Sequence, residues 1–341
     1  MSYFKSTLSA YGFFLLAGFI WLTPVLMPSA LAQPPLEPQQ VLAAIVSVHA
    51  EVPATARTAA ALGTERDGSG VIIDQDGLVL TIGYLILEAL TVDITLADGQ
   101  RMPAQIVAYD HNSGFGLLRA SRPLTNRPVP LGDPATLQNG DPILIISRTQ
   151  QENITPAQVI IRKTFAGSWE YLLDDAIFTS PPHPDFNGAA LIGKQGELLG
   201  IGSLILNDVL ADQPAAAVTP GNMFVPVDLL PPVLPELLAQ GRRSKVHPWL
   251  GLYTREYRGY LFVEQVSENG PAAQAGLTQN DLIVAVARQP VSTLSGFLRQ
   301  VWALGDAGVT VPLTVLRDAQ LVDLQITSGD RYNWLQLNPA L

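Results

Sequence analysis

Short apolar runs separated by polar turns fill the middle of the chain. Residues 71–73 precede an Asp-Gly turn at 76–77, residues 78–80 follow it, and residues 92–96 lead to a second Asp-Gly turn at 98–99. Strands of a few residues joined by such turns are typical of hairpins in β-sandwiches and β-barrels. The pattern therefore predicts a series of antiparallel strands.

The series continues to about residue 206. The chain also has 28 Gly and 27 Pro, an excess that favours many turns between short strands. We therefore expect a mainly β fold with enough strands for two small barrels. The further apolar runs lie at 106–108, 116–118, 143–146, 159–161 and 198–201.

The pattern changes after a proline-rich break at 231–235. A short helix is predicted at 236–240, and the basic residues Arg242, Arg243 and Lys245 then suggest a solvated linker. Beyond it, a compact mixed α/β unit is expected over 249–329. Its predicted strands are 261–266, 282–286, 313–316 and 322–326, and its amphipathic helix is 294–304. Further back, the Ala- and Thr-rich segment 51–66 reads as a mobile loop.

The N-terminal residues carry features of an export signal. Lys5 is the only basic residue before an apolar run at 11–26, and Ser29-Ala30-Leu31-Ala32 supplies an Ala-x-Ala cleavage signature. We predict a secretory signal peptide at 1–32; the alternative is an uncleaved membrane anchor. Either one exports residues 33–341 from the cytoplasm.

Composition narrows the classes of function. The net charge is −10, which argues against nucleic acid or anionic lipid as a partner. There is no cysteine, so disulfides, thiolate catalysis and thiolate metal sites are excluded. No cofactor is expected, and no His, Asp or Glu spacing matches a metal-ligand motif.

Three blocks of sequence resemble the HtrA/Deg family, whose members carry a trypsin-like double β-barrel protease followed by PDZ domains. Residues 68–81 resemble its Gly-Ser-Gly strand and Asp-Gly turn, and residues 110–119 its catalytic Asp segment. Residues 184–191 resemble its Pro-Gly-Asn-Ser-Gly-Gly-Pro-Leu nucleophile loop. The resemblance covers about residues 40–329. It implies a trypsin-like domain at 33–232, a linker at 233–248, a PDZ domain at 249–329 and a tail at 330–341.

All three catalytic positions of that family are changed in this sequence. The general base, the orienting acid and the nucleophile fall on Tyr84, Gly114 and Asn187. A phenol is a poor base at neutral pH, glycine cannot orient a base, and an amide is no nucleophile. Asp185 stands where the family has glycine, beside the oxyanion position. The resemblance therefore implies a pseudoprotease without catalytic residues.

Other residues could in principle rebuild a site. His183 with Asp185 and Ser180 could form a catalytic group, as could His111 with Ser113, but sequence neighbours rarely assemble such a geometry, and a solvated surface histidine is the favoured interpretation of both. A metal site from His183, Asp185 and His111 is disfavoured in the same way, because their spacing matches no metal-ligand motif. Tyr84 has two interpretations: it fills the space left by the missing His–Asp pair, or it stacks on a ligand.

The C-terminal unit keeps its family's pattern. Residues 261–277 and 280–283 resemble the PDZ signature, and Trp249-Leu250-Gly251-Leu252 lies where such domains carry their carboxylate-binding loop. Loop N–H groups would capture a terminal carboxylate while the peptide adds as a strand to the sheet edge. Leu298 and Val301 are expected to line the pocket for the last residue. The alternative is a PDZ fold used only for packing.

These features predict an exported, periplasmic HtrA-like pseudoprotease that binds peptide or protein C-termini as a scaffold, adaptor or regulator. Its own tail, ending in Leu341, could also fill the PDZ groove. By resemblance, we expect an oligomer, a trimer as in the family, and assembly with an active HtrA-type protease or other exported proteins. The alternatives are a serine endopeptidase with a rearranged site and a structural subunit of an exported complex.

Overall fold

The computed structural model describes residues 36–149, 151–213 and 215–337. The predicted signal peptide and the last four residues lie outside this range. Within it, no helix is long and apolar enough to cross a membrane.

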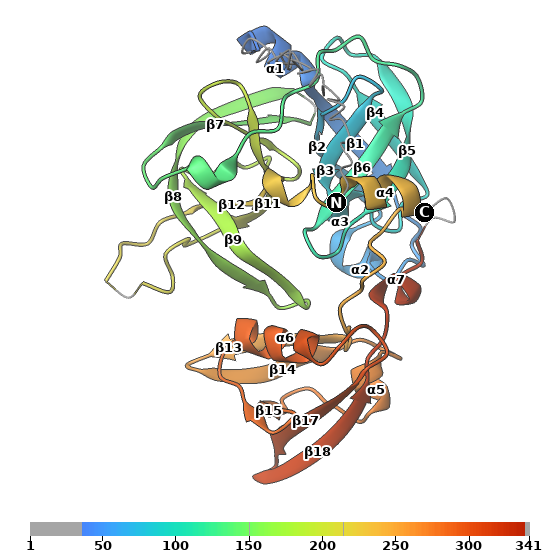
Figure 1. The fold of residues 1–341 in the computed structure, drawn as a ribbon, viewed down its shortest axis with the longest axis vertical. Helices are drawn as coiled ribbons and strands as arrows, with labels where there is room; N and C mark the ends of the chain where they lie inside the picture. The colour runs from blue at the N-terminus through green and yellow to red at the C-terminus, as the bar shows by residue number, and fades with distance from the viewer. Residues whose placement is uncertain (1–35, 150, 214, 338–341) are drawn as a thin grey trace, which may run out of the picture. The chain divides into compact units, whose positions relative to one another are not determined.

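The first six strands close into a barrel in the order β1-β2-β3-β6-β5-β4 (Figure 1). Apolar side chains such as Val48, Leu80 and Leu117 fill it without exposed surface. The short helix α3 (Gly83–Ile86) follows β3 directly and places Tyr84 at the end of this strand. The strands are β1 (Ile45–Glu51), β2 (Glu65–Ile72), β3 (Leu78–Ile82), β4 (Thr91–Thr95), β5 (Arg101–Tyr109) and β6 (Phe115–Ala120).

The next six strands close a second barrel in the order β10-β11-β12-β9-β8-β7 (Figure 1). Its interior holds Phe178 and Phe224, which are fully buried. Two of its strands form a long hairpin whose tip is Ser168-Trp169-Glu170, because Gly167 pairs with Tyr171. The strands are β7 (Pro142–Arg148), β8 (Glu152–Gly167), β9 (Tyr171–Ser180), β10 (Ala190–Ile192), β11 (Leu198–Leu206) and β12 (Gly221–Pro226).

The C-terminal unit is a sheet in the order β13-β14-β15-β17-β18, with β16 paired to β15. β13 lies at the edge of this sheet and has β14 as its neighbour. Helix α6 begins after Thr293, whose hydroxyl accepts the Gly296 N–H, and its Phe297 is fully buried. The elements are β13 (Leu252–Tyr257), β14 (Tyr260–Val266), α5 (Pro271–Gln274), β15 (Leu282–Val286), β16 (Gln289–Pro290), α6 (Leu294–Ala303), β17 (Thr310–Arg317) and β18 (Gln320–Thr327).

Short helical segments connect and flank these units. The predicted helix at 236–240 is present and begins two residues earlier, as α4 (Leu234–Gln240), ending at Gly241 with φ +73°. After β18, α7 (Arg331–Trp334) packs Tyr332 against Tyr109 of the first barrel. The remaining helices are α1 (Pro38–Ala44), α2 (Ala59–Leu62), η1 (Pro134–Thr136) and η2 (Val227–Leu229).

The mainly β fold with two barrels and a mixed C-terminal unit is confirmed. The prediction of a solvated linker was wrong. Arg243 donates two hydrogen bonds, of 2.8 and 2.7 Å, to the buried carboxylate of Asp110. Arg242 also bonds to Asp330. Sequence alone gave no sign of these acids, because they lie far from the linker along the chain.

The mobile loop predicted at 51–66 was also wrong. It contains α2 and the start of β2. The Glu88 carboxylate accepts hydrogen bonds from the backbone N–H groups of Arg57 and Thr58 and from the Thr58 hydroxyl. An acid about thirty residues away therefore fixes a segment whose composition is typical of loops.

Candidate functional site

The structure brings Tyr84 and Asn187 into direct contact across the two barrels. The Tyr84 hydroxyl lies 2.8 Å from Asn187 Oδ1 and 2.9 Å from the Ser203 carbonyl oxygen, so its hydrogen is shared between two acceptors. Burial raises the pKa of the Tyr84 phenol, which keeps it protonated at neutral pH. The ring also packs against the apolar core to which both barrels contribute. A protonated donor facing an amide cannot act as a general base.

Gly114 lies beside α3 and adopts a left-handed conformation. Its φ is +84°, its N–H donates to Asp110 O at 2.7 Å, and its carbonyl accepts the Gly83 N–H at 2.6 Å. A Cβ added here would lie 3.1 Å from the Tyr171 hydroxyl, which itself donates to Ser113 O at 2.5 Å. This backbone therefore has little room for an acidic side chain at the position.

The loop that carries Asn187 is anchored by both barrels. Asn187 O accepts the Ser69 N–H at 2.8 Å, and the Gly188 N–H donates to Gly202 O at 3.0 Å. A Cβ on Gly188, whose φ is +72°, would lie 2.1 Å from Ser69 O. Only glycine fits there. The loop therefore keeps the close backbone approach to Ser69 that Gly188 allows, although the residue at the nucleophile position is Asn187. Asp185 accepts a hydrogen bond from Asn153.

The structure does not assemble the substitute site around His183. Its ring is buried between two hydroxyls, Ser147 Oγ on Nε2 and Thr155 Oγ1 on Nδ1, both at 2.8 Å. Burial lowers the pKa of His183. Ser180 instead donates its hydroxyl to Pro220 O. His183 therefore belongs to an internal hydrogen-bond network of the second barrel.

The other histidines are also engaged elsewhere. His111 Nδ1 lies 3.0 Å from the Tyr109 hydroxyl, and burial lowers its pKa, while Ser113 bonds to Asp110 instead. His49 pairs with Asp67 at 2.8 Å, and His247 stacks on Trp302. Among the described residues, no three His, Cys, Asp or Glu side chains are grouped so as to hold a metal ion.

The predicted carboxylate-binding loop holds a carboxylate of the chain itself. The backbone N–H groups of Leu250, Gly251 and Leu252 donate to the side chain of Glu170, at 2.8, 2.7 and 3.1 Å. Gly251 has φ +76°, which turns its N–H into line with its neighbours. Trp249 anchors the loop start, because it exchanges backbone hydrogen bonds with Gly329. The loop therefore has the donor geometry of a carboxylate site.

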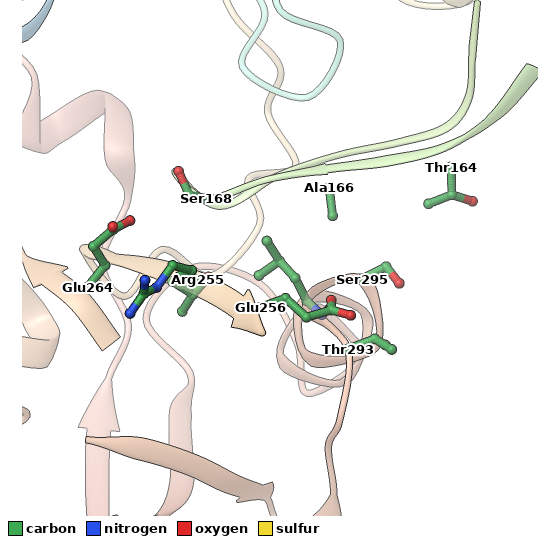
Figure 2. A pocket seen from close by; sticks show the side chains of 10 residues that line it. Thr164, Ala166, Ser168, Arg255, Glu256, Glu264, Thr293 and Ser295 are labelled. Carbon is green, nitrogen blue, oxygen red and sulfur yellow. The ribbon is translucent and has the colours of Figure 1, made fainter. Parts of the chain in front are cut away.

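A groove of about 490 Å³ lies between the β8–β9 hairpin, β13 and the first turn of α6. Figure 2 shows Ala166 and Ser168 of the β8–β9 hairpin on one side of the groove, with Arg255 and Glu256 of β13 and Ser295 of α6 on the other. Leu294 lines the groove, whereas Leu298 and Val301 lie in the buried core of the C-terminal unit. The lining residues are Thr164, Ala166, Ser168, Thr254, Arg255, Glu256, Glu264, Thr293, Leu294 and Ser295.

Sequence reasoning missed Ser168 and Glu170. Both lie at the tip of the β8–β9 hairpin, about eighty residues before the loop that they meet. The apolar pattern predicted a strand on the β8 side of this hairpin but gave no signal for β9 or for the contact of the tip with a distant loop. A single acidic residue in a turn is normally exposed, yet the side chain of Glu170 is buried.

Comparison with known proteins agrees with the two-part architecture. A model described as a trypsin-like peptidase domain matches residues 68–201, and a PDZ domain model matches residues 248–327. The serine endoprotease DegS of Escherichia coli K12 is 28% identical over 76% of this chain and 76% of its own length. The periplasmic serine endoprotease DegP of the same strain is 26% identical, with 56% of its length covered.

Solved structures share the fold. The HtrA-type protease AlgW, solved with a decapeptide, covers 88% of this chain and 98% of its own with a TM-score of 0.54 and 20% identity. A serine endoprotease from Yersinia pestis gives a TM-score of 0.52 over 87% of this chain. The chain is therefore similar over most of its length to serine endoproteases, and its two matched regions are a trypsin-like peptidase domain followed by a PDZ domain.

Proposed function

We propose that the chain is an exported HtrA-like pseudoprotease that binds peptide or protein C-termini through its PDZ domain. The observation that supports it best is the loop of Leu250, Gly251 and Leu252, whose three N–H groups converge on one carboxylate. A free terminal carboxylate offers the same two oxygens to such a loop. β13 has a strand neighbour in the sheet only on the β14 side, so its other edge can take the peptide backbone as an added strand.

The lack of peptidase activity forms the second part of the proposal. Acyl transfer needs a nucleophile, a base and an oriented proton path, and Asn187, Tyr84 and Gly114 supply none of them. Loss of the triad lowers turnover on the order of a millionfold. The chain would then act as a scaffold, adaptor or regulator in periplasmic protein quality control or assembly, alone or with an active relative in an oligomer.

A direct assay tests this absence of activity. The purified protein is incubated with unfolded casein and with a serine-directed fluorophosphonate probe, next to an active HtrA-type protease under the same conditions. We expect neither cleavage nor labelling of this chain. Stoichiometric labelling of a serine would favour the second candidate, a serine endopeptidase with a rearranged site, which the match to the trypsin-like peptidase model supports.

Peptide binding is measured separately. Fluorescent decapeptides that end in a free apolar residue are compared with the same peptides amidated at the C-terminus. We expect binding of the free acids and little binding of the amides, because amidation removes the negatively charged carboxylate to which the loop N–H groups donate. Equal binding of both forms would contradict C-terminal recognition, and no binding of either would favour the purely structural subunit.

A further inference from the structure

The β8–β9 hairpin meets the PDZ loop in the manner of a bound peptide. The Glu170 carboxylate receives the three loop N–H groups, and its side chain is only 3% exposed. Two residues earlier, Ser168 O accepts the backbone N–H of Thr254 on the edge strand β13 at 3.1 Å. A carboxylate in the loop and a backbone hydrogen bond to the sheet edge are the two contacts by which PDZ domains hold a C-terminal peptide.

Side chains around the tip complete the contact. Ala166 and Leu172 pack against the core of the C-terminal unit on either side of the tip. Asp174 on β9 forms an ion pair with Arg299 on α6. The carbonyl oxygens of the tip are also engaged, Trp169 O by Arg331 at 2.7 Å and Glu170 O by His111 at 3.3 Å. The hairpin therefore closes the groove with backbone, apolar and charged contacts together.

We propose that Glu170 is an internal ligand of the PDZ loop, so that a C-terminal peptide binds only by displacing the tip of the β8–β9 hairpin. This inference rests on the proposed peptide-binding function and adds the regulation of that site. The same three N–H groups cannot serve two carboxylates at once, so the closed and the peptide-bound states exclude each other.

The electrostatics of the closed state favour replacement of the Glu170 carboxylate by the carboxylate of a peptide. Burial raises the pKa of Glu170, and the N–H donors and Arg331 offset this only in part. The carboxylate therefore loses solvation that its partners do not fully replace. An incoming peptide that keeps part of its carboxylate in water does not carry the same cost. Its measured affinity is then its intrinsic affinity multiplied by the fraction of molecules with an open loop.

The first test compares the full chain with Glu170→Ala and Glu170→Gln, using fluorescent decapeptides that end in a free apolar residue. We expect both variants to bind at least about tenfold more tightly, since the loop is free in all molecules. Glu268→Gln, at an exposed position of the C-terminal unit, removes an equal charge and should bind like the unchanged chain. Circular dichroism shows whether each variant is folded.

A second test needs no substitution. Amide hydrogen exchange of the unchanged chain is followed at residues 166–172 and 250–252 with and without peptide. Bound peptide should speed exchange at the hairpin tip by at least about tenfold while the loop stays protected. A hairpin that stays protected under saturating peptide overturns the inference, even if the Glu170 variants fail to fold.

The outcomes separate the two proposals. Peptide binding that is equal in the unchanged chain and in folded Glu170 variants overturns the internal ligand but leaves C-terminal recognition intact. Binding by neither the chain nor its Glu170 variants contradicts C-terminal recognition, and with it the displacement. In that case, amide exchange at residues 250–252 would still be informative. Faster exchange there in Glu170→Ala than in the unchanged chain would identify Glu170 as the occupant of the loop.

Discussion

At the scale of single residues, the protease position and its neighbours have adapted to each other. Tyr84 donates to Asn187, and the pair occupies the place where a base would face a nucleophile. The backbone of Gly114 is hydrogen-bonded to Asp110 and Gly83, and the Tyr171 hydroxyl lies close to where a Cβ of residue 114 would be. The changes are therefore mutually compatible, and reversing one of them disturbs its neighbours.

Gly114→Asp tests this directly. An aspartate at φ +84° is strained and meets the Tyr171 hydroxyl at 3.1 Å from its Cβ. We expect the free energy of unfolding to fall by about 1–3 kcal/mol, measured by urea titration. Gly99→Asp also has a positive φ, of +85°, but open space around its Cβ, and serves as the control for strain alone. Equal losses in both variants would show that Tyr171 does not crowd the position.

The residues of the site were only partly predictable from sequence. The spacing within residues 68–81 and 184–191 located Tyr84 and Asn187, because short loops keep their register with the strands that carry them. The loop at 249–252 was found in the same way. Glu170 could not be found, since its role depends on where a long hairpin ends relative to another domain. No local pattern encodes that distance.

At the scale of elements, strands and helices followed the apolar pattern closely where turns were marked by glycine. The predicted strand 282–286 and helix 294–304 differ by at most one residue from β15 and α6. The apolar pattern did not predict β1, β9, β10, β12, β13 or β16. β9 joins β8 through the tip that contacts the PDZ loop, where the positive φ falls on Glu170 and not on a glycine.

The ion pair between Arg317 on β17 and Asp281 before β15 gives the PDZ sheet a defined pH response. Asp281 is almost fully buried; burial alone would raise its pKa, but the hydrogen bonds from Arg317 and from the Thr278 N–H lower it overall. The folded-state pKa thus lies below the unfolded value of about 3.9. This stabilisation is present above that value and is lost as pH falls through the lowered folded-state pKa.

Arg317→Gln should therefore lower the melting temperature at pH 7, with a loss of about 1–3 kcal/mol, because it leaves a buried carboxylate short of donors. The difference from the unchanged chain should shrink below about pH 4, as Asp281 becomes protonated. Calorimetry between pH 7 and pH 3 measures this. Arg288→Gln, a change of equal charge in the same domain, provides the matched control. A difference that stays constant over this range would show that the ion pair is not its source.

At the scale of the whole molecule, the segment after β18 returns to the first barrel. Tyr332 is 6% exposed, stacks edge-on with Tyr109 and donates its hydroxyl to Tyr109 O at 3.2 Å. Gln336 N donates to Glu88 at 2.8 Å. The predicted tail at 330–341 is thus a packed part of the structure as far as residue 337. The residues proposed to fill the PDZ groove, 338–341, lie outside the described range.

Tyr332→Ala removes the largest of these contacts. We expect a loss of roughly 3 kcal/mol in unfolding free energy, as for other buried aromatic side chains. Tyr332→Phe keeps the ring and should lose only about 1 kcal/mol, from the hydroxyl contacts. Thermal unfolding followed by tryptophan fluorescence reports on both, because Trp334 lies in the same helix. Losses of similar size in the two variants would mean that ring packing contributes little.

With Glu170 as the proposed internal ligand, the hairpin tip would also set a threshold for peptide binding. A ligand carried on the same chain is present at a fixed effective concentration, on the order of millimolar for a short tether, however dilute the protein becomes. Chance encounters with single, weakly held C-termini would then leave Glu170 in place. Only partners that are abundant, clustered or held by further contacts would open the groove, so the chain would report on crowding of exposed C-termini and ignore isolated ones.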